Sequence, residues 1–130
     1  MNNRLKIAVY DEMQANREVT VRLLTAYYKA KSQTVEILQF KDAEELTGSF
    51  RKNSFSAVFI GINGMRDVDA AWVIRDRDKK CPLIITSKNG DYSLEGYRLE
   101  ATDYLTEPLD EQKVYRALEQ IKKKRNGGIQ

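Results

Sequence analysis

The residues of this chain that could support chemistry begin with two adjacent carboxylates. Asp11 and Glu12 directly follow the apolar run LKIAVY. Paired carboxylates suit a divalent cation, because hard ions such as Mg2+ and Ca2+ prefer oxygen ligands. The same pair would repel the phosphate of a nucleotide or a flavin. A second interpretation stays open, in which both residues are helix N-terminal acids stabilised by the helix dipole.

Composition excludes most other kinds of site. The 130 residues include no histidine, which removes Ser-His-Asp and Cys-His catalysis and most zinc sites. The single cysteine, Cys81, excludes an internal disulfide, and we expect it to be a small buried filler. Neither a GxGxxG motif nor a Walker phosphate loop is present. The sequence therefore predicts a protein that is not an enzyme.

The elements that must position these residues alternate along the chain. Apolar runs of strand length fall at residues 5–10, 35–40, 57–60, 83–86 and 103–106, with amphipathic stretches between them. Four of the runs are apolar on both faces, as in parallel strands that helices cover on both sides. This alternation predicts an α/β fold, a doubly wound five-stranded parallel sheet of the flavodoxin-like (β/α)5 type.

The stretches between the strands carry apolar residues at helical spacing. The first repeats every fourth residue, at Val19, Leu23 and Tyr27. The last has the i, i+3, i+4, i+7 pattern of a buried stripe, at Val114, Ala117, Leu118 and Ile121. Asp67 is the expected N-cap of the third helix, and Trp72 is expected to face the core. We expect one domain over residues 1–125, followed by a tail or linker at 126–130.

Ligands of an open parallel sheet bind beyond the carboxyl ends of its strands. The polar or unusual residues at those ends are Asp11, Glu12, Gly61, Asn63, Thr86 and Glu107. The expected site is therefore one edge of the sheet.

Several segments in the same order resemble a known family. They are IAVYDE, FSAVFIGINGM, PLIITS and DYSLEGYRLEATDYLTEP. Over about residues 4–124 the chain resembles the receiver domain of bacterial two-component response regulators. It is most similar to receivers that precede LytTR-type DNA-binding domains.

The resemblance implies a role for each matching position. Asp11 and Glu12 match the acidic pair that holds Mg2+, and the carbonyl of Asn63 would help to bind the metal. Thr86 matches the hydroxyl residue that contacts the phosphoryl group. Tyr104 matches the aromatic switch residue whose rotamer follows that contact.

Two departures from the family remove chemistry. Gly61 stands where the family has its phosphoaccepting aspartate, and Glu107 stands where it has a lysine that pairs with the phosphoryl charge. Phosphotransfer needs a carboxylate nucleophile, and a glutamate would repel the phosphoryl group. We expect Asp67 and Asp69 to lie at the start of a helix rather than to replace the nucleophile. The resemblance with these departures predicts a pseudo-receiver in a signalling pathway, which acts without aspartate phosphorylation and regulates transcription.

A second function, that of a ligand or metal sensor, remains open as an alternative to the pseudo-receiver. The chain could sense a ligand or metal in a vacated acidic pocket, with Mg2+ or Ca2+ held by Asp11, Glu12 and Glu107. Otherwise no cofactor is expected. Removing an aspartate and replacing a lysine by a glutamate makes this pocket more acidic than that of an ordinary receiver.

Expectations about partners follow from the family and from charge. The tyrosines Tyr92, Tyr97 and Tyr104 lie around the fourth helix and fifth strand. With the fifth helix they form the face at which we expect a protein partner or a homodimer, with a LytTR-type domain attached in a longer parent. The net charge of +3 is concentrated in the basic run 122–125, interpreted as a solvated helix end. We therefore expect no direct nucleic-acid binding and no membrane contact.

The single cysteine and the absence of a signal peptide or apolar span predict a cytoplasmic protein. The peptide bond between Glu107 and Pro108 matches a cis bond of the family, and we expect it to be cis here.

Overall fold

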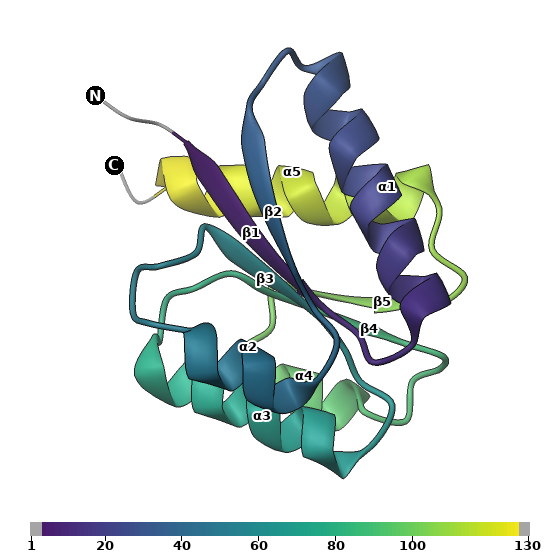
Figure 1. Cartoon of the computed structure of the whole chain (residues 1–130), viewed down its shortest axis with the longest axis vertical. Helices are drawn as coiled ribbons and strands as arrows, with labels where there is room; N and C mark the ends of the chain where they lie inside the picture. Colours follow the sequence, from purple (N-terminus) through teal and green to yellow (C-terminus); the bar gives the residue numbers. More distant parts are fainter. Residues whose placement is uncertain (1–3, 128–130) are drawn as a thin grey trace.

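A computed structural model describes residues 4–127 as a parallel sheet with helices on both faces (Figure 1). The strands are β1 (Leu5–Tyr10), β2 (Val35–Phe40), β3 (Ala57–Gly61), β4 (Leu83–Ser87) and β5 (Asp103–Thr106). The helices are α1 (Gln14–Ala30), α2 (Ala43–Ser49), α3 (Met65–Arg77), α4 (Ser93–Arg98) and α5 (Glu111–Gly127). All five predicted strands are present, and β3 and β4 each end one residue later than expected.

The strand order is β2-β1-β3-β4-β5, and all pairings are parallel. In register, Tyr10 pairs with Ile60 and Gly61 pairs with Thr86. The order reverses at β1, which lies between β2 and β3. The predicted α/β fold with a five-stranded parallel sheet is confirmed.

Each face of the sheet has its own apolar core. Helices α1 and α5 cover one face, and α2, α3 and α4 cover the other (Figure 1). The predicted stripe of α5 is buried, at Val114, Ala117, Leu118 and Ile121. The core beneath α2 and α3 includes Phe50, Phe55 and Ile74, and Trp72 is partly buried against it. Cys81 is buried as expected, at 4% exposure.

The third helix begins earlier than predicted. Gly64 is the N-cap of α3, so Asp67 lies inside the first turn rather than at the cap. The Asp67 carboxylate accepts the backbone N–H of Asn63 at 2.8 Å, so it still satisfies a donor just before the helix. Asp69 is exposed on the same helix. Neither carboxylate follows β3 directly.

Helix α5 continues to Gly127, two residues past the expected domain end at 125. Residues 128–130 of the expected tail lie outside the described residues. Within residues 4–127, no helix combines the length and apolar character needed to cross a membrane.

Candidate functional site

The predicted site residues meet at the carboxyl edge of the sheet. Asp11 follows β1, Gly61 ends β3, and Thr86 pairs with Gly61 from β4. Backbone hydrogen bonds tie the segments beyond the strands together. The N–H of Ile62 donates to the Thr86 carbonyl at 2.8 Å, and the N–H of Glu107 donates to the Ser87 carbonyl at 2.7 Å.

The side chain of Asp11 occupies the space beside Gly61. A Cβ placed on Gly61 would lie 2.5 Å from Cγ and 3.1 Å from Cβ of Asp11, and closer still to Oδ2. Real Cβ atoms essentially never come within 3.0 Å of another heavy atom. Any side chain at position 61 therefore requires Asp11 to move. The pocket expected to be vacated is filled here by a carboxylate.

Hydrogen bonds hold Asp11 in this orientation. Its Oδ1 accepts the backbone N–H of Met13 at 2.9 Å and the side-chain amide of Asn63 at 3.2 Å. The Arg17 guanidinium donates to the Asp11 backbone carbonyl at 2.6 Å. Asp11 is only 3% exposed, and this burial raises the pKa of its carboxyl above the ordinary value.

A buried tyrosine–aspartate pair braces the same edge. The Tyr10 hydroxyl donates to Asp67 Oδ1 at 2.5 Å. Burial raises the pKa of Tyr10, and the hydrogen bond to Asp67 raises it further, so the hydroxyl stays protonated. Asp67 thus joins the end of β1 to the loop that carries Asn63. The N-cap interpretation overlooked this role, because only the tertiary fold brings Tyr10 to α3.

Glu107 turns toward α1. Its Oε1 accepts the side-chain amide of Asn16 at 3.3 Å, and it is half-buried. Burial raises the pKa of Glu107 and the negative charge of Asp11 raises it further, while Lys88 acts in the opposite direction. The Glu107–Pro108 peptide bond is cis, as predicted.

The expected cation site of three carboxylates is not assembled. Asp11 turns against Gly61, Glu12 is exposed, and Glu107 contacts α1. Across residues 4–127, no three acidic, histidine or cysteine side chains form a group that could hold a metal ion. The interpretation counted the charges at this edge and did not foresee the rotation of each carboxylate.

The predicted switch residues lie on neighbouring strands. Thr86 is buried on β4, and Tyr104 is partly buried on β5. The Tyr104 hydroxyl donates to the Asn89 carbonyl at 2.7 Å and accepts the Tyr92 N–H at 3.2 Å. A Cβ added at Gly96 of α4 would lie 3.1 Å from the Tyr104 ring, so this glycine allows α4 to pack closely on β5. Tyr104 therefore fixes the loop that leads into α4.

The outer side of α4 exposes two large apolar side chains. Tyr97 is 83% exposed and Leu94 is 57% exposed, three residues apart on one helix. Tyr92 packs against the core instead. On α5, which covers the other face of the sheet, Arg116 forms a two-bond contact with Asp103 of β5 at 2.9 and 3.0 Å. Of the three expected contact tyrosines, Tyr97 is the one that faces outward.

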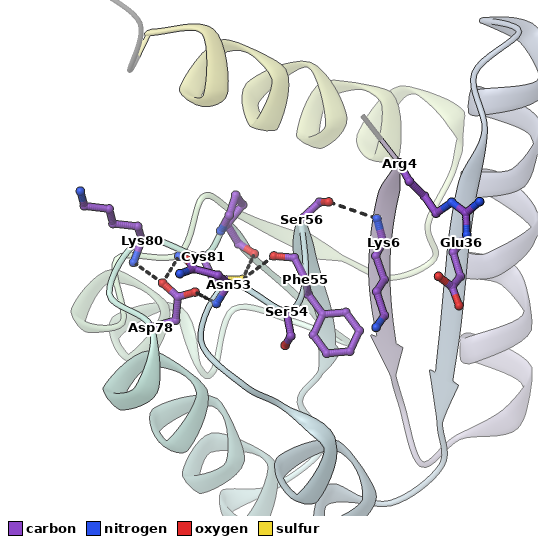
Figure 2. A pocket seen from close by; sticks show the side chains of 11 residues that line it. Arg4, Lys6, Glu36, Asn53, Ser54, Phe55, Ser56, Asp78, Lys80 and Cys81 are labelled. Atoms are coloured by element: carbon purple, nitrogen blue, oxygen red, sulfur yellow. Dashed lines mark hydrogen bonds between the residues drawn. The ribbon is translucent and has the colours of Figure 1, made fainter. Parts of the chain in front are cut away.

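A groove of about 460 Å3 lies at the opposite, amino-terminal edge of the sheet (Figure 2). In Figure 2 the Asp78 carboxylate accepts the backbone N–H groups of Asn53, Lys80 and Cys81, at 3.0–3.1 Å. Burial works against ionisation of Asp78, yet these three donors lower its pKa. Burial raises the pKa of the Cys81 thiol to about 12, so it stays protonated and unreactive. This groove lies far from Gly61 along the strands and is separate from the predicted site.

Comparisons with known proteins find similar sequences and the same fold. The scan against family models matches none. The chain is 24% identical to the sensory transduction protein LytT of Bacillus anthracis over 127 residues, covering 95% of this chain. It is 23% identical to LytT of Bacillus subtilis, covering 90% of the chain. The chain spans about half the length of these relatives, 49% and 47%.

Solved structures share the fold closely. The REC domain of AraT, a response regulator from Geobacillus stearothermophilus, matches 97% of this chain and 98% of its own length, with a TM-score of 0.80 and 19% identity. A CheY-like response regulator receiver domain from Methanospirillum hungatei matches 96% and 99%, with a TM-score of 0.76 and 15% identity. The chain is a domain of the response regulator receiver (CheY-like) fold, distantly related to the LytT sensory transduction proteins.

Proposed function

We propose that the chain is a two-component signalling module of the receiver type that works without aspartate phosphorylation. The observation that carries this proposal is the Asp11 carboxylate packed against Gly61. Phosphotransfer needs a carboxylate nucleophile that forms an acyl phosphate, and glycine provides none. The space into which a phosphoacceptor side chain would project already holds a negative charge.

The remaining chemistry of the edge supports the same proposal. Glu107 occupies the position of the family's lysine and lies near enough to Asp11 for their charges to interact. A phosphoryl group here would face two carboxylates, which would raise the free energy of the transferred state. Asn63, whose carbonyl the family uses for metal binding, has its side-chain amide bound to Asp11.

The proposed module would pass on its signal through a protein-binding surface on α4, which does not require phosphorylation. Tyr97 and Leu94 expose two apolar side chains on α4. We propose that this face binds a partner protein or a second copy of the chain. Through it the domain would regulate a transcriptional output domain of the LytTR type. The similarity to longer sensory transduction proteins supports this assignment.

Intact-mass spectrometry after incubation with acetyl phosphate and Mg2+ tests the first part. We expect no gain of a phosphoryl group, and a stoichiometric, acid-labile gain would overturn the proposal. The double variant Gly61→Asp with Glu107→Lys is the matched comparison, and it should gain some uptake if Asp11 can move aside. Each single variant should gain less.

Sedimentation at micromolar concentration tests the α4 face. Tyr97→Ala should weaken dimerisation or partner binding. The matched control is Met65→Ala, which removes another large exposed side chain, 60% exposed, from α3. A chain that stays monomeric and whose output is indifferent to Tyr97→Ala would contradict this face as the interface.

A further inference from the structure

Arg75 of α3 is a buried cation that no interpretation of the sequence singled out. It is 5% exposed, and its guanidinium donates to backbone carbonyls of two separate turns. Nε donates to Leu99 O at 2.8 Å, and Nη2 donates to Glu100 O at 3.3 Å. Nη1 donates to Asp78 O at 3.1 Å and to Cys81 O at 2.9 Å. One side chain therefore joins the α3–β4 turn to the turn that follows α4.

The turn after α4 has a backbone conformation that is unfavourable for a residue other than glycine. Glu100 has a φ of 56°, in the left-handed region that favours glycine. The N–H of Ala101 donates to Gly96 O and that of Glu100 donates to Tyr97 O, which together form a Schellman motif. A glutamate stands where this motif usually has glycine. The two carbonyls that Arg75 binds there belong to Glu100 and to its neighbour Leu99.

Helix α4 is thus tied at both ends by side chains from other elements. At its start, Tyr104 of β5 binds the backbone of Asn89 and Tyr92. At its end, Arg75 of α3 binds the backbone of Leu99 and Glu100. The helix between these ties has six residues, too few for its own hydrogen bonds to hold it in place.

We propose that Arg75 is a positioning residue that holds α4 in one place through the turn at residues 99–100. The importance of α4 rests on the proposed function, in which its outer face binds a partner. In that setting Arg75 supplies a permanent restraint, so the presentation of Tyr97 does not depend on a phosphoryl group. The restraint requires arginine, because a planar guanidinium has five donors in a fixed fork, whereas a lysine ammonium has three on a single nitrogen.

Amide hydrogen exchange on the isolated chain tests this inference. In Arg75→Lys, exchange of the Leu99 and Ala101 amides should become at least tenfold faster relative to the central strand β3. The matched control is Arg77→Lys, two residues further along α3. Arg77 also donates to backbone carbonyls, at Thr47 and Phe50 near the end of α2, so it should loosen α2 and leave α4 unchanged.

A second variant distinguishes a local effect of Arg75 on α4 from a loss of stability of the whole domain. Glu100→Gly relieves the turn, because glycine adopts a positive φ freely. It should slow α4 exchange in the Arg75→Lys background, and it provides a folded reference if Arg75→Lys alone does not fold. A uniform increase across all strands, or an equal increase at α4 in Arg77→Lys, would overturn the inference. Exchange needs no partner, so loss of the proposed interface would leave this result intact.

Discussion

The close approach of Asp11 to position 61 predicts the effect of a single methyl group. Gly61→Ala places a Cβ 2.5 Å from Cγ of Asp11 and nearer to its Oδ2, so the carboxylate has to rotate away. Rotation gives up the hydrogen bonds from the Met13 N–H and the Asn63 amide. The backbone is no obstacle, because no glycine among the described residues has a positive φ.

The expected cost follows from these contacts. Overpacking a filled interior costs about 1–3 kcal/mol, and a hydrogen bond to a charged group contributes about 1.5–3 kcal/mol. The rotated carboxylate recovers part of this by reaching water, and the alanine gains about 0.4–1 kcal/mol from a less flexible unfolded chain. We expect Gly61→Ala to lower the free energy of unfolding by about 2 kcal/mol.

Urea unfolding followed by far-UV circular dichroism measures this change. Gly90→Ala is the matched control, because Gly90 lies outside the helices and strands and a Cβ there meets nothing within 4 Å. Removing the obstacle in Asp11→Ala should make the second change, Gly61→Ala, nearly free, which gives a favourable coupling energy. Equal stability of the Gly61→Ala and Gly90→Ala variants would refute the reasoning.

Two further predictions concern buried polar groups. Thr102→Val should raise the free energy of unfolding by about 1 kcal/mol, because Thr102 Oγ1 is the buried side-chain polar atom that lacks a hydrogen-bond partner among the described residues. Thermal unfolding measures this, and a destabilised variant would contradict it. Burial raises the pKa of Asp11 and of Glu107, so each contributes most stability below its unfolded pKa and loses it as pH rises through the folded value. Asp11→Asn should therefore gain stability relative to the wild type as the pH rises above the ordinary pKa of an aspartate, and parallel pH profiles in urea would contradict this.

The fold was predictable because strand patterns are local. Most of the strands are runs rich in apolar residues, and the observed bounds of all five differ from the predicted ones by at most one residue. The face of α1 that packs against the sheet was not predicted correctly. The spacing of Val19, Leu23 and Tyr27 predicts one stripe, whereas the structure buries Thr20, Leu24, Tyr27 and Tyr28. The Thr20 hydroxyl donates to the Asn16 carbonyl, which allows a polar side chain to be buried there.

The meeting of the site residues was also predictable, because parallel strands bring their carboxyl ends to one edge. Their orientations were not. Asp11 carries the same carboxylate whether it faces solvent, a cation or Gly61, and no spacing in the sequence distinguishes these rotamers. The role of Arg75 was equally hidden, because its acceptors are backbone carbonyls, which every residue has.

The way in which side chains fill space explains why counting charges did not predict the arrangement at the carboxyl edge of the sheet. Counting charges at positions 61 and 107 predicts a vacated and more acidic pocket. Protein interiors are close-packed, however, so space freed by a missing side chain is taken up by a neighbour that can rotate into it. Asp11 does so, and the Met13 N–H and Asn63 amide offset part of its desolvation. Returning an aspartate to position 61 therefore requires two changes, a new side chain and a displaced Asp11.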